Sequence, residues 1–158
     1  MKDKIYDVTA HTRWIKLPIS TKFLVISSCF FLIPGYYAFL LGLYWYLATS
    51  AITTIVSINY WRYAVPGLRR SLDMVIAKIS FTIYFVTGVL NINNLSVLYI
   101  SWPLCGGILT CYYYSKKMWE KNSETWIFYH VMFHVFVAIG QCVVLYGSFH
   151  SLWWTIFR

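Results

Sequence analysis

Two histidines within a single apolar run are the residues of this chain best placed to do chemistry. His130 and His134 lie one helical turn apart, so a helix would present both side chains on the same face. They fall inside the run WIFYHVMFHVFVAIG, residues 126–140. Ionisable groups at bilayer depth are costly and need a partner, a cavity or a metal. The pair therefore indicates a site, and both metal binding and hydrogen bonding between helices fit its spacing.

The composition predicts the environment in which this site must be built. Of 158 residues, 59% are hydrophobic, 21% are aromatic and only 11% are charged. So little polar surface is typical of an integral membrane protein. No polar stretch is long enough to form a soluble domain, so any activity must lie between helices. We therefore expect one all-α transmembrane domain covering residues 1–158.

Five apolar runs predict a bundle of five transmembrane helices. Each run approaches the roughly 20 residues that cross about 30 Å of hydrocarbon. The first is expected to end where Pro34-Gly35 interrupts it, and Asn122 offers an N-terminal cap for the last. The predicted spans are residues 20–33, 36–61, 68–90, 95–114 and 122–146.

The basic residues predict the orientation of this bundle. Eleven of the 13 lysines and arginines fall in segments that five spans would place on one side, against Arg158 on the other and Lys78 inside a helix. By the positive-inside rule the N-terminus is then cytoplasmic and the C-terminus lies outside or in a lumen. The identity of the membrane is left open. The eleven are Lys2, Lys4, Arg13, Lys16, Lys22, Arg62, Arg69, Arg70, Lys116, Lys117 and Lys121.

The remaining composition argues against two other classes of protein. The net charge of +8 is spread over short loops and forms no basic stripe with interleaved aromatics, so nucleic acid is not an expected partner. The four cysteines lie in apolar segments without paired spacings, and we expect free thiols. Residues 1–17 mix acids and bases and do not resemble a cleaved signal peptide.

The predicted topology brings further polar residues to the level of the histidines. Ser57 lies near the cytoplasmic end of the second span and Asp73 near the cytoplasmic start of the third. Both would share a layer with His130 and His134. Asp73 also has an alternative partner in Arg69 or Arg70, one turn earlier on the same helix face.

Taken together, these motifs resemble those of a known membrane superfamily. Ser57-Ile-Asn-Tyr-Trp61, Arg69-Arg-Ser-Leu-Asp73 and His130-Val-Met-Phe-His134 are similar in order and placement to the motifs of the superfamily of hemolysin III, the progestin and adipoQ receptors and the alkaline ceramidases. The resemblance implies a zinc ion held by histidines, with a serine and an aspartate orienting the zinc-bound water for lipid amide hydrolysis. Carried over by position, His130 and His134 would be ligands, and Ser57 and Asp73 would orient the water.

The chain departs from the family pattern in two respects. Trp61 stands where the family has its third histidine, and indole cannot bind zinc. In addition, five spans are predicted where the family has seven. Asp73 could complete a His, His, Asp ligand set, and His11 could fold back from the cytoplasmic segment.

Three functions are compatible with these observations. The first is a reduced, non-catalytic relative of the zinc hydrolases that binds membrane lipids or acts as a scaffold. The second is a metal-dependent lipid amide hydrolase with an altered ligand set. The third is a small subunit of a larger membrane complex, or a homo-oligomeric pore. Trp61 argues against the second, and the layer of histidines, Ser57 and Asp73 argues against a passive third.

Overall fold

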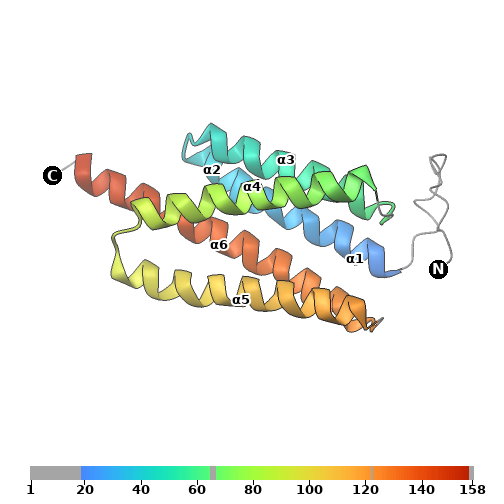
Figure 1. Ribbon diagram of the computed structural model, residues 1–158. Helices are drawn as coiled ribbons and strands as arrows, with labels where there is room; N and C mark the ends of the chain where they lie inside the picture. The colour runs from blue at the N-terminus through green and yellow to red at the C-terminus, as the bar shows by residue number, and fades with distance from the viewer. Residues whose placement is uncertain (1–18, 65–66, 122, 157–158) are drawn as a thin grey trace.

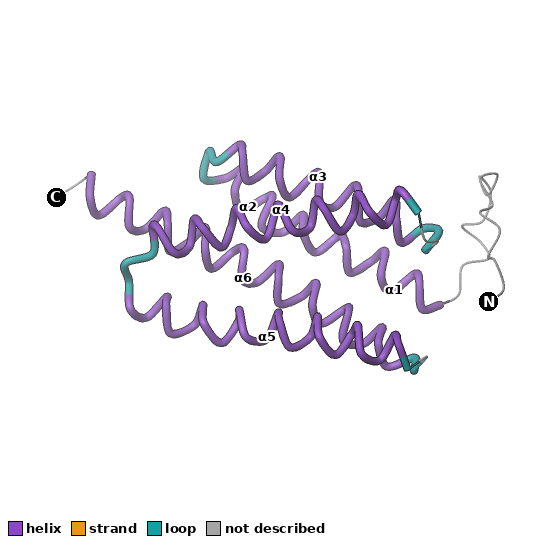
Figure 2. The backbone as a smooth tube through the Cα atoms, in the orientation of Figure 1, coloured by secondary structure: helices purple, strands orange, loops and turns teal. Residues whose placement is uncertain are grey.

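The chain folds into a bundle of long helices. The computed structural model describes residues 19–64, 67–121 and 123–156 (Figure 1). Figure 2 shows helices and loops and no strand in the described part of the chain. In chain order the elements are α1 (Ile19–Ser28), the short 3-10 helix η2 (Cys29–Phe31), α2 (Leu32–Leu40), α3 (Tyr44–Trp61), α4 (Leu68–Asn91), α5 (Leu95–Glu120) and α6 (Thr125–Ile156).

This architecture is that of a multi-pass helical membrane protein. Four stretches of the described residues are long and apolar enough to cross a membrane: Thr21–Leu40, Leu68–Asn91, Leu95–Glu120 and Thr125–Phe149. Many large apolar side chains on these helices point outward, as lipid-facing side chains do. The predicted all-helical membrane fold is therefore confirmed.

The helix α3 differs from the other long helices in polarity. Its 18 residues would extend about 27 Å, which is close to the hydrocarbon thickness. Five serines and threonines lower its hydropathy, and four of them are buried inside the bundle: Ser50, Thr53, Thr54 and Ser57. Most of its hydroxyl groups therefore face protein, which is the condition under which a polar helix is tolerated at membrane depth. The helix α3 is not among the four stretches that are apolar enough to cross a membrane by composition.

The boundary between the first two predicted spans lies elsewhere than expected. The helix does not end at Pro34-Gly35 but continues to Leu40. Pro34 occupies the first turn of α2, just after η2, where a backbone N–H needs no partner within the helix. At Gly35 a Cβ would lie 3.1 Å from Cβ of Ser50, so this glycine allows α2 to pack closely on α3.

The actual turn between α2 and α3 is centred on Gly42. This residue has a φ of 71°, a left-handed conformation that glycine adopts without strain. The N–H of Gly42 donates to the carbonyl of Phe39 at 3.0 Å, and that of Leu43 donates to the carbonyl of Ala38 at 2.8 Å. This pair of bonds is the Schellman motif that ends many helices.

The last helices are longer than the sequence pattern predicted. The helix α5 continues to Glu120, past its predicted end at residue 114, and α6 continues to Ile156, past residue 146. Asn94 caps α5 by accepting a hydrogen bond from the N–H of Ser96 at 2.9 Å. Pro103 lies inside α5 without ending it. The predicted cap Asn122 lies outside the described residues.

The helix α6 is the centre of the bundle. It packs against α1, α2, α4 and α5, while α3 packs against α1, α2 and α4. The helix α5 rests on α6 alone among the described elements, and no Cα atom of α4 comes within 8 Å of α5. Consequently α4 and α5 both run along α6 but stay apart from each other (Figure 1).

Two apolar clusters close the two ends of the interior. The first is built on Leu24, Val25, Tyr60 and Trp61, from α1 and α3. The second is built on Ala38, Tyr84 and Leu145, from α2, α4 and α6. The polar side chains described next lie beside the first cluster, at the end of the bundle where α1 begins.

Candidate functional site

His134 is the most deeply buried histidine described, with 3% of its surface exposed. Its Nδ1 atom lies 2.8 Å from the hydroxyl oxygen of Ser27 on α1. The Ser27 hydroxyl donates to the carbonyl of Leu24 at 3.0 Å. Because a hydroxyl has one proton, Ser27 is left as the acceptor and His134 as the donor from Nδ1. The Nε2 atom of His134 then carries the free lone pair.

Ser57 connects α1, α3 and α4. Its hydroxyl lies 3.0 Å from that of Ser28, which donates to the carbonyl of Leu24 at 2.8 Å. The Asp73 side chain of α4 lies near the Ser57 hydroxyl. Both serines are almost completely buried. The hydroxyls of Ser57 and Ser28 thus lead from the neighbourhood of Asp73 into the bundle.

His130 lies one turn before His134 and is surrounded by aromatic rings. Its Nδ1 atom lies 3.1 Å from the hydroxyl of Ser115 on α5. The rings of His130 and His134 are 4.8 Å apart between centroids, and the indole ring of Trp61 is 4.8 Å from that of His130, edge to face. The indole Nε1 of Trp61 is buried and has no hydrogen-bond partner among the described residues.

The four residues singled out from the sequence therefore form two neighbouring groups. The two histidine rings lie edge to face on α6, while Ser57 and Asp73 lie near each other between α3 and α4. Two serines of α1 link these groups to that helix: Ser27 is hydrogen-bonded to His134, and Ser28 is hydrogen-bonded to Ser57. The sequence reasoning missed these serines and Ser115. A serine pair within an otherwise apolar span, and a serine at the end of another, are signals that could have identified them.

Asp73 does not use the alternative partners expected on its own helix. Among the described residues the one salt bridge within 4.0 Å joins Lys116 and Glu120. The guanidinium of Arg69 instead lies over the ring of Tyr63, 4.2 Å from its centroid. The Asp73 side chain is partly buried beside Ser57.

The resemblance implied a metal site formed by His130, His134 and Asp73. In the part of the chain that the structure describes, no three His, Cys, Asp or Glu side chains are grouped closely enough to hold a metal ion. Asp73 is thus not grouped with the two histidines there, and it lies near Ser57. Both histidine Nδ1 atoms are hydrogen-bonded to serines, which leaves two nitrogens where catalytic zinc typically takes three protein ligands. His11 lies outside the described residues.

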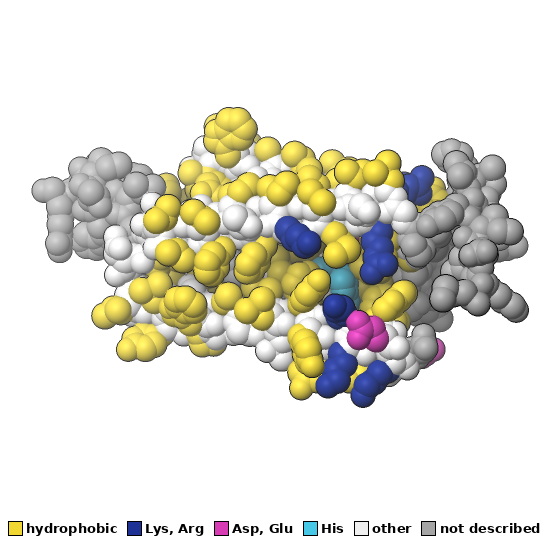
Figure 3. Space-filling view, viewed as in Figure 1, with side chains coloured by type: hydrophobic (Ala, Val, Ile, Leu, Met, Phe, Trp, Pro, Cys, Tyr) yellow, Lys and Arg dark blue, Asp and Glu magenta, His cyan; other side chains and the backbone are white. Residues whose placement is uncertain are grey.

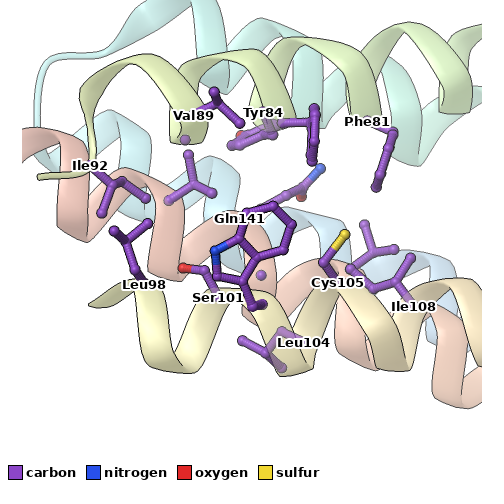
Figure 4. Close-up of a pocket in the computed structure, with 16 residues that line it drawn as sticks. Phe81, Tyr84, Val89, Ile92, Leu98, Ser101, Leu104, Cys105, Ile108 and Gln141 are labelled. Carbon is purple, nitrogen blue, oxygen red and sulfur yellow. The ribbon is translucent and has the colours of Figure 1, made fainter. Parts of the chain in front are cut away.

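A second feature, not foreseen from the sequence, is a groove in the gap between α4 and α5. Its volume is about 270 Å³, and its floor is formed by α6. Figure 4 shows Phe81, Tyr84 and Val89 of α4 opposite Leu98, Ser101 and Cys105 of α5, with Gln141 between the two helices. The lining is otherwise almost entirely apolar. We refer to it as the α4–α5 groove.

The surface around the groove is apolar over most of its length. Figure 3 shows hydrophobic side chains across this face, with Lys and Arg side chains gathered toward the end where α1 begins and histidine surface visible among them. The groove floor consists of Val137, Gly140, Gln141 and Val144. His134 precedes Val137 by about one helical turn and lies on the same face of α6. The groove and the histidine layer therefore follow one another along α6.

Comparison with protein families, with characterised proteins and with solved structures yields no match to this chain. The similarity to the hemolysin III and alkaline ceramidase superfamily consequently rests on the motifs quoted above.

Proposed function

We propose that this chain is a five-span membrane protein that binds one apolar chain of a membrane lipid in the α4–α5 groove. The observation that carries the proposal is the separation of α4 from α5, which leaves a groove with apolar walls. Both bordering helices are candidate membrane spans. The groove thus opens sideways toward the region that lipid chains occupy.

The size of the groove favours a single chain as its occupant. Ligand pockets typically enclose roughly 300–1,000 Å³, and this groove, at about 270 Å³, falls just below that range. Its lining runs from Phe81 on α4 to Ile92, just past the end of that helix, a distance of about 16 Å. A long and narrow apolar groove suits an extended hydrocarbon chain better than a bulky ring system.

Photolabelling with a lipid tests this proposal. The full-length protein is reconstituted in vesicles that contain phosphatidylcholine with a diazirine on one acyl chain. We expect labelled peptides to map to the groove-facing residues of α4 and α5. Cys105→Phe should fill the groove and reduce this labelling, whereas Leu109→Phe, on the exposed face of α5, should leave it unchanged. Equal labelling of all outward faces in all three proteins would contradict the proposal.

A metal-dependent lipid amide hydrolase is the second candidate. The observation in its favour is that the adjacent histidines, with Ser57 and Asp73 close to each other, lie in the same half of the bundle. Hydrolysis of a fluorescent long-chain amide by the purified protein, abolished by a chelator and restored by zinc, would support it. Activity that is equal with and without chelator would remove the metal from the proposal.

A further inference from the structure

Gln141 is the polar residue at the floor of the α4–α5 groove. It is 4% exposed, and its side-chain Nε2 donates to the hydroxyl of Ser80 at 3.2 Å. Its Oε1 atom is buried and accepts no hydrogen bond from the residues that the structure describes. A buried amide oxygen without a partner costs free energy, and the hydrocarbon around these helices contains no water to supply one.

The other hydroxyls of the groove lining are already engaged. The Tyr84 hydroxyl lies 3.0 Å from that of Ser50, within the bundle. The Ser101 hydroxyl donates to the carbonyl of Val97 on its own helix at 2.8 Å. Neither bonds to Gln141, and the Gln141 side chain lies in the groove between α4 and α5 (Figure 4), so the unmet hydrogen-bonding capacity of the amide is next to the groove. A ligand in the groove is the remaining source of a partner.

We propose that the α4–α5 groove selects a long-chain lipid alcohol, whose hydroxyl group bonds to the Gln141 amide while its hydrocarbon chain fills the apolar part of the groove. This inference rests on the proposed lipid-binding function and names the class of ligand. A hydroxyl both donates and accepts, so it suits the side-chain amide, and it carries no charge that would oppose entry into hydrocarbon.

The position of Gln141 agrees with this assignment. Its partner Ser80 lies about 18 Å along α4 from Leu68, well inside the span. From this level the lining continues with mostly apolar side chains along α4 to Ile92, just past the end of that helix. One amide on the floor of an otherwise mostly apolar groove matches an alcohol, which joins one hydroxyl to a hydrocarbon chain.

Competition against the photoreactive phosphatidylcholine tests the inference on the full-length protein. The competitors are a long-chain primary alcohol and its methyl ether, which has the same chain but no donor. In the wild-type protein we expect the alcohol to displace the label at a concentration lower by roughly threefold to tenfold, the effect of one net hydrogen bond. Gln141→Leu should abolish this preference while the groove is still labelled. Ser101→Ala, a matched control in the same groove, should retain it.

The outcomes separate this inference from the proposed function. If alcohol and ether displace the label equally from the wild-type protein, the groove binds lipid chains but the role of Gln141 is refuted. A preference for the alcohol that persists in Gln141→Leu refutes it as well. If the groove is not labelled at all, the lipid-binding function itself fails and the inference fails with it.

Discussion

The Nδ1 atom of His134 lies 2.8 Å from the hydroxyl oxygen of Ser27, so a residue of the last helix is hydrogen-bonded to one of the first. Because Ser27 also donates to the Leu24 carbonyl, the histidine is held as the tautomer protonated at Nδ1. The ring is further enclosed by Phe31, whose centroid is 5.0 Å away. His134 thereby has a structural role in joining α6 to α1, whatever else it does.

Removal of the Ser27 hydroxyl should therefore destabilise the bundle. Ser27→Ala leaves a buried N–H of His134 without an acceptor, and we expect a loss of about 1–3 kcal/mol in the free energy of unfolding. Thr49→Ala is the control, since that hydroxyl bonds only to the Trp45 carbonyl of its own helix. Unfolding by titration with a denaturing detergent measures both variants. Equal effects of the two substitutions would show that the bond between the helices contributes nothing.

Replacement of Trp61 by histidine should create zinc affinity. The Trp61 ring lies 4.8 Å from His130, so an imidazole at this position adds a third nitrogen ligand beside the two histidines. We expect Trp61→His to bind zinc at one ion per chain and Trp61→Phe, which also removes the indole, to bind none above background. Plasma emission analysis of the purified proteins measures the bound metal. No gain in Trp61→His would mean that these helices do not hold a zinc-binding geometry.

Gly147 on α6 and Gly106 on α5 should respond differently to replacement by alanine. At Gly147 a Cβ would lie 2.9 Å from Val97 and 3.0 Å from Ile92, where α6 meets the α4–α5 connection. Overpacking predicts a loss of about 1–3 kcal/mol for Gly147→Ala. At Gly106 no atom lies within 4 Å of the added Cβ, so Gly106→Ala should be neutral or stabilise the protein by up to about 1 kcal/mol. Thermal unfolding in detergent compares them, and a stable Gly147→Ala would show that this contact is loose.

The two ends of the chain should lie on opposite sides of the membrane. The helix α1 begins at one end of the bundle and α6 ends at the other (Figure 1). The distribution of basic residues predicts that the N-terminal side is cytoplasmic. Epitope tags at the two termini should therefore differ in protease accessibility in sealed vesicles. Equal accessibility would show that the number of spans is even.

The amino-acid sequence by itself determined the class of the protein and the positions of most of its helices. Long apolar runs have few ways to satisfy their backbone groups in lipid, so helices over 68–90 and 95–114 followed from composition alone. The helical spacing of His130 and His134 likewise required a shared face, because one turn of a helix fixes it. These are local properties, which depend on residues close together in the chain.

The tertiary structure decided where neighbouring segments turn and which distant residues meet. Pro34 could end a helix or enter its first turn, and the close contact of Gly35 with Ser50 selected the second. The bond between Ser27 and His134 joins residues 107 positions apart, and no local pattern encodes such a pairing. The α4–α5 groove depends on two consecutive helices resting on α6 without touching each other. That arrangement follows from the packing of all the helices on α6, a property of the whole bundle.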